Sequence, residues 1–288
     1  MFKNRKKHGL LILVLLLLAI NIFLFRLDWR NSHRGLTFAM LNVGQGDALF
    51  IESPTGTQIL MDGGPAKKVL NELPRVMSPF DKSIDALIIT NPDADHIGGF
   101  LDILKTYKVD VVFESGTLSD SKTFQNLKNE IKNKNIPDIL VKKEMILDLG
   151  GEAKLNILFP DRDVSEWATN DGSVVAQLIY GKNKIMLTGD ATIKTEKIIL
   201  AENGASQLKS TVLKVGHHGS RTSTSPSFVQ AVAPIYALIS NGKDNKYGHP
   251  HKETLDTLEQ FGAKILRTDL LGTIIMKCDI LGPCEINW

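Results

Sequence analysis

The chain has 288 residues, of which 43% are hydrophobic and 23% are charged. This length and composition exclude a disordered or fibrous protein and provide for one large domain or two small ones. The formal net charge is +2, but residues 1–34 hold seven basic side chains and one acid, so residues 35–288 carry 27 basic and 31 acidic side chains, a net charge of −4. The main part of the chain therefore lacks the positive field of a dedicated nucleic-acid-binding protein.

Residues 9–25 read GLLILVLLLLAINIFLF, in which only Asn21 is clearly polar. As a helix this run spans about 25 Å, close to the lower limit for crossing a bilayer. The basic segment 1–8 precedes it and favours a cytoplasmic N-terminus, and residues 26–35 form a short stalk. The sequence thus predicts an uncleaved signal anchor, a single pass through the cell membrane and an extracellular domain.

A cleaved signal peptide is the alternative, because a run of this length also fits the hydrophobic region of a secretory signal. The chain would then be secreted. The residues after Phe25 read RLDWRNSHRG, which contains no pair of small residues typical of a cleavage site. This absence favours the anchor.

From residue 36 to residue 278, short β-branched runs alternate with amphipathic helical stretches. The first half predicts strands at 36–43, 47–53, 57–62, 85–90 and 109–115, and helices at 66–76, 100–107 and 121–135. The second half predicts strands near 155–159, 173–180, 184–189, 211–216, 235–240, 264–267 and 272–278, and helices at 191–203, 225–233 and 252–261. Two β-rich halves with helices favour an α/β fold with two sheets packed face to face and helices outside. Residues 279–288 are expected to form a C-terminal tail.

The sequence contains two cysteines, Cys278 and Cys284, too few for a scaffold built from disulfides. They lie close enough in the chain to close a small loop beside Gly282 and Pro283. In an exported domain a disulfide is plausible at this position, and two buried free thiols are the alternative.

The densest group of polar side chains is TNPDADHIGG at 90–99, directly after a predicted strand. A tight loop at the end of a strand can direct Asp93, Asp95 and His96 toward one point. Two carboxylates and an imidazole are donors suited to a divalent metal ion. Helix capping by Asp95 is the alternative, but capping accounts for one aspartate and not for the whole Asp-x-Asp-His pattern.

Three further groups of polar residues also follow predicted strands. Asp190 lies in MLTGDAT between a strand and a helix, where a lone aspartate is most simply an N-cap. His217 and His218 are adjacent, and on extended backbone adjacent side chains point in opposite directions, so at most one of them is expected to face a site. His249 and His251 lie in the next loop. Strand ends are where α/β sheets bind ligands.

Five segments resemble the metallo-β-lactamase superfamily in order and spacing, and most closely the metallo-β-lactamase-like domain of ComEC competence proteins. They are LNVGQGDALFIESPTGTQILMDGG, ITNPDADHIGG, MLTGD, LKVGHHGSRTS and NKYGHPHKETLDTL. The resemblance covers residues 36–278 and implies a four-layer αββα sandwich with a metal site at one edge. Matched by position, Asp95, His96 and His249 are implied to be ligands of a second metal site. Asp190 matches a carboxylate that bridges the two metal sites. Asp62 matches an aspartate that supports the loops carrying the ligands.

The first metal site of the superfamily is altered in this sequence. The His-x-His-x-Asp-His pattern has become Asn91-x-Asp93-x-Asp95-His96, and the histidine that usually completes the site later in the chain is missing. With Asn170 as the nearest substitute, the implied first site consists of Asn91, Asp93, Asn170 and Asp190. Such oxygen donors favour Mn²⁺ or Mg²⁺, whereas the second site should bind Zn²⁺ or Mn²⁺, so one or two divalent ions are expected.

The resemblance implies a metal-dependent hydrolase of phosphoesters, acting on DNA or on a phosphorylated envelope component, and the predicted anchor implies that it is exported. Asp95 would orient the nucleophile. His217 and His218 match an HHG element in which a histidine contacts the metal or the scissile group, and one of them would stabilise developing charge or protonate the leaving oxygen. Basic residues flank the proposed site and could form a phosphate cradle, although the net negative charge disfavours DNA slightly. They are Lys214, Arg221, Lys243 and Lys246.

A degenerate, non-catalytic domain with a partial metal site is the competing class. The loss of two first-site histidines supports it. The number of polar residues that remain at strand ends argues against it, because a purely structural fold does not need them. The sequence does not indicate a protein partner.

Overall fold

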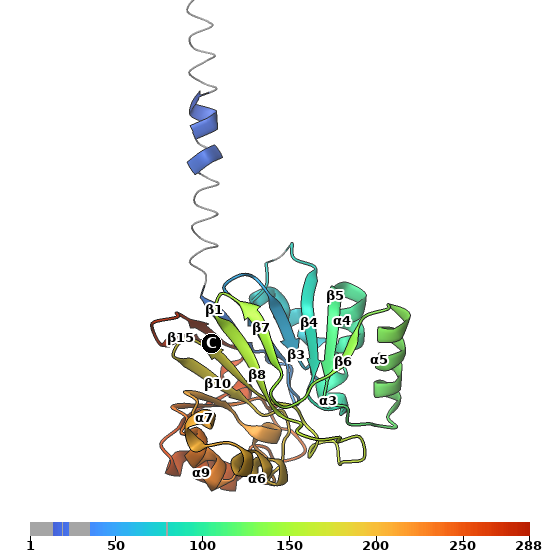
Figure 1. The fold of residues 1–288 in the computed structure, drawn as a ribbon, viewed down its shortest axis with the longest axis vertical. Helices are drawn as coiled ribbons and strands as arrows, with labels where there is room; N and C mark the ends of the chain where they lie inside the picture. The colour runs from blue at the N-terminus through green and yellow to red at the C-terminus, as the bar shows by residue number, and fades with distance from the viewer. Residues whose placement is uncertain (1–13, 19, 23–34, 79) are drawn as a thin grey trace, which may run out of the picture.

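The computed structural model describes residues 14–18, 20–22, 35–78 and 80–288 (Figure 1). The predicted anchor at 9–25 and the stalk at 26–35 therefore lie largely outside the described residues. In the described part of the chain, no helix has both the length and the apolar character needed to cross a membrane.

The larger of two mixed sheets has the strand order β15-β14-β1-β2-β3-β4-β5-β6 in the described residues. Its strands are β1 (Leu36–Met40), β2 (Leu49–Glu52), β3 (Gln58–Met61), β4 (Ser83–Ile89), β5 (Lys108–Glu114), β6 (Asp138–Leu140), β14 (Ile274–Cys278) and β15 (Cys284–Asn287). The strands from β3 to β6 are parallel, and the remaining pairs are antiparallel.

The second sheet has the order β13-β12-β11-β10-β9-β8-β7. Its strands are β7 (Ile146–Gly150), β8 (Ala153–Phe159), β9 (Val175–Tyr180), β10 (Asn183–Leu187), β11 (Val212–Lys214), β12 (Tyr236–Ile239) and β13 (Lys264–Arg267). The strands from β10 to β13 are parallel. Each sheet thus has one parallel half, and the carboxyl ends of parallel strands meet at the same edge of a sheet.

Helices cover the outer face of each sheet. The first group comprises α2 (Lys68–Glu72), η1 (Leu73–Arg75), α3 (Ala94–Ile97), α4 (Phe100–Thr106) and α5 (Lys122–Asn133). The second comprises α6 (Ile193–Glu202), α7 (Ala205–Leu208), η2 (Gly216–Gly219), α8 (Pro226–Val232), α9 (Lys252–Gln260) and α10 (Thr268–Leu271).

Three apolar clusters lie between these layers of sheets and helices. Along β1, Phe38 and Met40 face the central core between the sheets, whereas Ala39 faces the core beneath the first group of helices. A third cluster lies between the second sheet and its helices and includes Phe228 and Leu258. Because successive strand residues point to opposite faces, a strand buried on both faces is a continuous apolar run, as the sequence shows here. The α/β fold with two sheets in four layers is confirmed.

The predicted C-terminal tail differs from the structure, because residues 284–287 form β15 and pair with β14. Cys278 and Cys284 lie opposite each other in this hairpin and form a disulfide, so the free-thiol alternative is wrong. Two other edge strands, β6 and β7, are also absent from the prediction. All three residues of β6 are exposed, so it carries no alternation of buried and exposed positions that could be recognised.

Candidate metal centre

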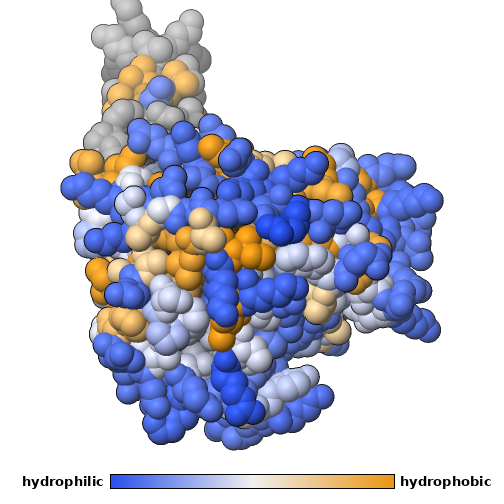
Figure 2. All heavy atoms as spheres, turned by 60° about the horizontal axis from the view of Figure 1, so that its bottom comes forward, coloured by the Kyte–Doolittle hydropathy of each residue, from blue (hydrophilic) through white to orange (hydrophobic). Residues whose placement is uncertain are grey.

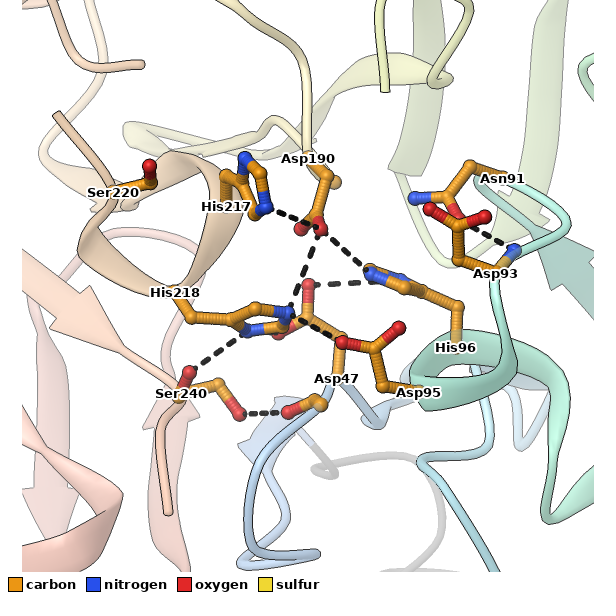
Figure 3. A network of polar contacts seen from close by, with 12 residues as sticks. Asp47, Asn91, Asp93, Asp95, His96, Asp190, His217, His218, Ser220 and Ser240 are labelled. Atoms are coloured by element: carbon orange, nitrogen blue, oxygen red, sulfur yellow. Dashed lines mark hydrogen bonds and ion pairs between the residues drawn. The ribbon is translucent and has the colours of Figure 1, made fainter. Parts of the chain in front are cut away.

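Four side chains from three loops converge at the edge where parallel strands end (Figure 3). Asp95 and His96 lie in α3, Asp190 follows β10, and His218 lies in η2; each offers one ligand atom, and these atoms all lie within 4.8 Å of one another. His96 Nε2 is 3.0 Å from Asp190 Oδ2, and His218 Nε2 is 3.5 Å from the same oxygen and 3.4 Å from Asp95 Oδ2. Three of the four are buried, while the side chain of Asp95 is 33% exposed.

The short helix α3 is held in place by close backbone packing. A Cβ added at Gly98 would lie 2.2 Å from the Pro65 carbonyl oxygen, and one at Gly99 would lie 2.1 Å from the Gly63 carbonyl oxygen. Neither glycine has the positive φ of a sharp turn. The close approach of the backbone is therefore the reason that these two positions require glycine. In addition, the Gly63 N–H donates to the His96 carbonyl oxygen at 2.6 Å.

Asp95 and Asp190 do not cap helices, which was the alternative role predicted for each of them. The N-cap of α3 is Asp93, and Asp95 lies inside the first turn; among the described residues, no side-chain cap hydrogen bond forms there. The N-cap of α6 is Thr192, two residues beyond Asp190. Both carboxylates thus point toward the histidines and not toward the helix ends.

Hydrogen bonds behind the histidines fix which ring nitrogen faces the site. His96 Nδ1 donates to Asp62 Oδ2 at 2.8 Å, and Asp62 also accepts from the Thr90 hydroxyl at 2.6 Å. His218 Nδ1 donates to the Ser240 carbonyl oxygen at 2.9 Å. With Nδ1 protonated, Nε2 of each neutral ring is free to act as a ligand, which is the usual arrangement at metal sites.

His217 and His218 adopt the left-handed backbone conformation, with φ values of 48° and 56°. The prediction that only one of them faces the site is wrong, because it assumed extended backbone. His217 Nε2 lies 3.7 Å from Asp190 Oδ2, so both rings approach the same carboxylate. This conformation is unfavourable for residues with a Cβ, and it is typical of functional sites.

Several potential ligand atoms of this group have no hydrogen-bond partner in the part of the chain that the structure describes. Among the described residues, Nε2 of His96, Nε2 of His218 and Oδ1 of Asp190 are buried without a hydrogen-bond partner. Buried polar atoms in proteins ordinarily have a partner. Imidazole nitrogens with carboxylate oxygens are common ligands of Zn²⁺ and of other divalent transition metals. These residues therefore fit a divalent metal ion.

The electrostatics of the cluster favour positive charge. Burial alone lowers the pKa of His96, but the carboxylates of Asp190 and Asp62 outweigh it and raise this pKa well above its ordinary value. Burial is likewise outweighed at His218, where Asp190 and Asp47 raise the pKa to about 10. Burial raises the pKa of Asp190, but the two imidazoles hold it well below its usual range. Protons and a metal ion therefore compete for the same place.

His249, predicted as a ligand of the second site, lies outside this group of four in the described structure. Its Nδ1 is 3.4 Å from Gln45 Nε2, and its ring stacks on that of Tyr247 and contacts the edge of His251. Burial and the neighbouring histidines lower the pKa of His249 to about 4, so the ring is neutral at neutral pH. The structure places His249 at the rim, beside His217.

The residues predicted for the first site are engaged in local hydrogen bonds. Asn91 Oδ1 accepts from the Asp93 N–H at 2.9 Å, and Asn91 Nδ2 donates to the Ser173 hydroxyl at 3.3 Å. Asp93 Oδ2 accepts from the Thr169 hydroxyl at 2.9 Å, and Asp93 belongs to neither group of converging ligand atoms in the described residues. Asn170 Oδ1 is buried and without a hydrogen-bond partner among them.

Two charged residues behind the site, Asp47 and Lys214, differ from the expectation drawn from the sequence. Asp47 is fully buried behind the histidines, with Oδ1 3.4 Å from His218 Nδ1. Its signal was a carboxylate at the start of an otherwise apolar strand, which the prediction included in the strand. Lys214 has no exposed surface and forms an ion pair with Asp47, so it cannot line an open phosphate cradle. The other three predicted cradle residues are exposed, namely Arg221, Lys243 and Lys246.

Residues 41–243 match the family described as the Metallo-beta-lactamase superfamily. The chain belongs to this superfamily, and its fold and converging His and Asp side chains agree with that membership.

Within the superfamily the chain is related to competence proteins. It is 33% identical over 253 residues to ComE operon protein 3 of Bacillus subtilis (strain 168), covering 82% of this chain and 32% of that protein. It is 27% identical over 246 residues to competence protein ComA of Neisseria gonorrhoeae, covering 81% of this chain and 31% of that protein. The chain thus spans about a third of the length of these curated relatives.

Solved structures share the fold at low sequence identity. Igni18, a metallo hydrolase from the hyperthermophilic archaeon Ignicoccus hospitalis, has a TM-score of 0.55 and 15% identity, over 84% of this chain and 100% of that chain. CmlA, a diiron β-hydroxylase from Streptomyces venezuelae, has a TM-score of 0.55 and 16% identity, over 85% of this chain and 54% of that chain. At such identities the likeness shows the fold alone.

Proposed function

We propose that the chain is a metal-dependent hydrolase of phosphoesters. The observation that carries this proposal is the convergence of Asp95, His96, Asp190 and His218, with buried Nε2 and Oδ1 atoms that lack hydrogen-bond partners among the described residues. Igni18 shows that a fold of this kind occurs in a metallo hydrolase. Membership of the superfamily supports the same class.

A divalent ion held by these four residues would lower the pKa of a bound water and polarise a phosphoryl oxygen. Asp95 is the one partly exposed member of the group, so its carboxylate is placed to orient a nucleophile arriving from the open side. His218 is buried and belongs to the ligand group, which leaves His217 to act on the substrate.

His217 has the geometry of a charge-stabilising group. Its side chain is 23% exposed, its Nε2 lies 3.7 Å from Asp190 Oδ2, and its Nδ1 lies 3.2 Å from the Thr222 hydroxyl. Burial lowers the pKa of His217, so the ring is neutral at neutral pH. A neutral imidazole still donates one N–H hydrogen bond, which can stabilise charge that develops on a phosphoryl or leaving oxygen.

DNA is the substrate that we propose first, because the curated relatives are competence proteins. The face shown in Figure 2 has hydrophilic side chains over most of its area and apolar ones near its middle. The exposed Arg221, Lys243 and Lys246 offer positive charge in the loops that carry the histidines. A phosphorylated envelope component is the alternative substrate. We further propose that residues 9–25 anchor the chain in the cell membrane with this domain outside.

The test is metal analysis of the full chain purified in detergent, followed by turnover of bis-p-nitrophenyl phosphate and labelled DNA with Mn²⁺ or Zn²⁺. Asp190→Ala should remove most bound metal and all hydrolysis, because Asp190 contacts both ligand histidines. A wild type that binds metal but turns over none of these substrates above an EDTA control would contradict the enzyme and favour a binding-only domain.

A further inference from the structure

Lys214, the last residue of β11, is fully buried directly behind the candidate metal centre. Its Nζ donates to the Gly189 carbonyl oxygen at 2.7 Å, forms an ion pair with Asp47, and lies 3.8 Å from Asp190 Oδ1. Lysine is almost never fully buried unless it is paired, because removing an ammonium group from water is costly. Packing alone does not explain why a charged lysine lies behind the candidate metal centre.

The partner of this ammonium group contacts the ligand histidines from behind. Asp47 Oδ1 lies 3.4 Å from His218 Nδ1, and Asp47 Oδ2 lies 4.0 Å from His96 Nδ1. Asp47, Asp62 and His96 form the second group of converging ligand atoms in the described residues. In that group Asp47 is ion-paired with Lys214, and His96 Nδ1 is hydrogen-bonded to Asp62. The Asp47 oxygens have no hydrogen-bond partner among the described residues, so the ammonium group is what balances their charge.

In the predicted first site, unpartnered oxygens remain on Asn170 and on Asp190 among the described residues, and Asp190 also belongs to the first group of converging ligand atoms. Asn91 and Asp93 are hydrogen-bonded to each other and to neighbouring hydroxyl groups. Among the described residues, unpartnered ligand atoms remain on the histidines and Asp190 of the first group, and on Asp47 of the second, where the ammonium group of Lys214 already lies. The negative charge of Asp47, and part of that of Asp190, is meanwhile balanced by an ammonium group built into the fold.

We propose that Lys214 takes the place of a second metal ion, so that each chain binds a single divalent ion. This inference rests on the proposed metal centre, and it adds a positioning role for Lys214. The ammonium group holds Asp47 behind the two histidines and fixes the carbonyl that precedes Asp190.

The number of ions bound per chain tests this proposal without any assay of activity. The full chain, purified in detergent and dialysed to equilibrium against Mn²⁺, is expected to hold one ion by elemental analysis. Lys214→Ala should hold two, because it leaves space beside the Asp47 carboxylate, Asp190 Oδ1 and the Gly189 carbonyl oxygen, and oxygen donors of this kind suit Mn²⁺.

Two further variants complete the experiment. Asp47→Asn combined with Lys214→Ala removes both charges of the pair, and this double variant should return to one ion. Lys154→Ala, which removes an exposed lysine of β8, should behave as the wild type. The melting temperature of Lys214→Ala should also rise more on addition of Mn²⁺ than that of the wild type, because an ion replaces the missing ammonium group.

Two ions in the wild type would overturn the proposal while leaving the proposed function intact, whereas a wild type with no ion would overturn both. A folded Lys214→Ala that holds one ion with unchanged affinity would also overturn it. A Lys214→Ala chain that stays unfolded even with Mn²⁺ would overturn the proposal too, because the proposal requires that the ion can replace the ammonium group.

Discussion

His217 and His218 are neighbours in the chain, yet their surroundings differ. His218 is buried, and its Nδ1 is held by the Ser240 carbonyl oxygen. His217 is partly exposed, and its ring contacts that of His249 at the rim. Two consecutive left-handed residues bring both rings to Asp190 from different depths, so one can hold an ion while the other reaches a substrate.

Alanine variants of these two histidines should therefore fail in different ways. His218→Ala should lose most bound metal together with hydrolysis, because it removes a ligand atom. His217→Ala should keep its metal and lose on the order of a hundredfold in kcat, the effect expected for a positioned acid or charge stabiliser. Metal content and turnover are measured on the same samples; full activity in His217→Ala, or full metal content in His218→Ala, would refute the division of roles.

The raised pKa of His218 makes the stability of the metal-free chain depend on pH. The pKa is about 10 in the folded chain and 6.5 in an unfolded one, so the proton on His218 stabilises the fold fully below pH 6.5, and this contribution is lost as pH rises toward 10. In EDTA, the melting temperature should fall over this range. With Mn²⁺ the stabilisation by metal should instead increase with pH, because fewer protons must be displaced.

Scanning fluorimetry at pH 6, 8 and 9.5, with EDTA or Mn²⁺, measures both trends. His218→Gln cannot carry the proton, so in EDTA its melting temperature should fall less over the same range. A stabilisation by Mn²⁺ that is equal at all three pH values would argue that no proton is displaced from the centre.

At the scale of single elements, α3 depends on how closely it approaches the loop at 63–66. Three carbonyl oxygens of this region lie within 2.2 Å of where a Cβ would stand at Gly46, Gly98 or Gly99. A short helix contributes little stability of its own, so its position depends on such contacts. The candidate ligands Asp95 and His96 are thus fixed by glycines, which offer no ligand atom themselves.

Gly98→Ala should test this dependence. Its Cβ would lie 2.2 Å from the Pro65 carbonyl oxygen, so backbone must move, and we expect a loss of about 1–3 kcal/mol in the free energy of unfolding and weaker metal binding. Gly204→Ala is the matched control, because the nearest atom to its added Cβ is 3.7 Å away. Urea titration compares the two, and equal losses would mean that α3 can shift freely.

At the scale of the whole molecule, the loops that carry the candidate centre lie on the side away from the start of β1 (Figure 1). If residues 9–25 anchor the chain as proposed, the loops that carry the ligands face away from the membrane and toward solvent. The disulfide between Cys278 and Cys284 suits an exported domain, because disulfides persist in oxidising compartments.

The proposed orientation predicts that a protease added outside intact cells cleaves the domain after residue 35. The charge difference across residues 9–25 is the reason, since basic residues remain on the cytoplasmic side. Immunoblotting with and without lysis measures this. Cleavage that occurs only after lysis would reverse the orientation, and a cytoplasmic marker protein controls for leakage.

Much of this architecture could be predicted because strands buried on both faces contain runs of apolar residues, as in the last three residues of β1 and the last four of β4. The loops that hold Asp95, His96, Asp190 and His218 could be predicted because each follows such a strand. The left-handed backbone of η2 could not, since histidine rarely adopts it and no local pattern signals it. The burial of Lys214 could not be predicted either, because a lysine at the end of a strand is expected to be exposed unless its buried partner is known.

The candidate centre draws two ligands from the loops of each sheet: Asp95 and His96 from one, Asp190 and His218 from the other. A bound ion would therefore be a crosslink between the two sheets, located outside the apolar core that joins them. The ion pair of Lys214 with Asp47 spans the same seam from within. Without the ion the sheets are joined less firmly at this edge, so amide hydrogens in α3 and η2 should exchange with solvent before those of the central strands.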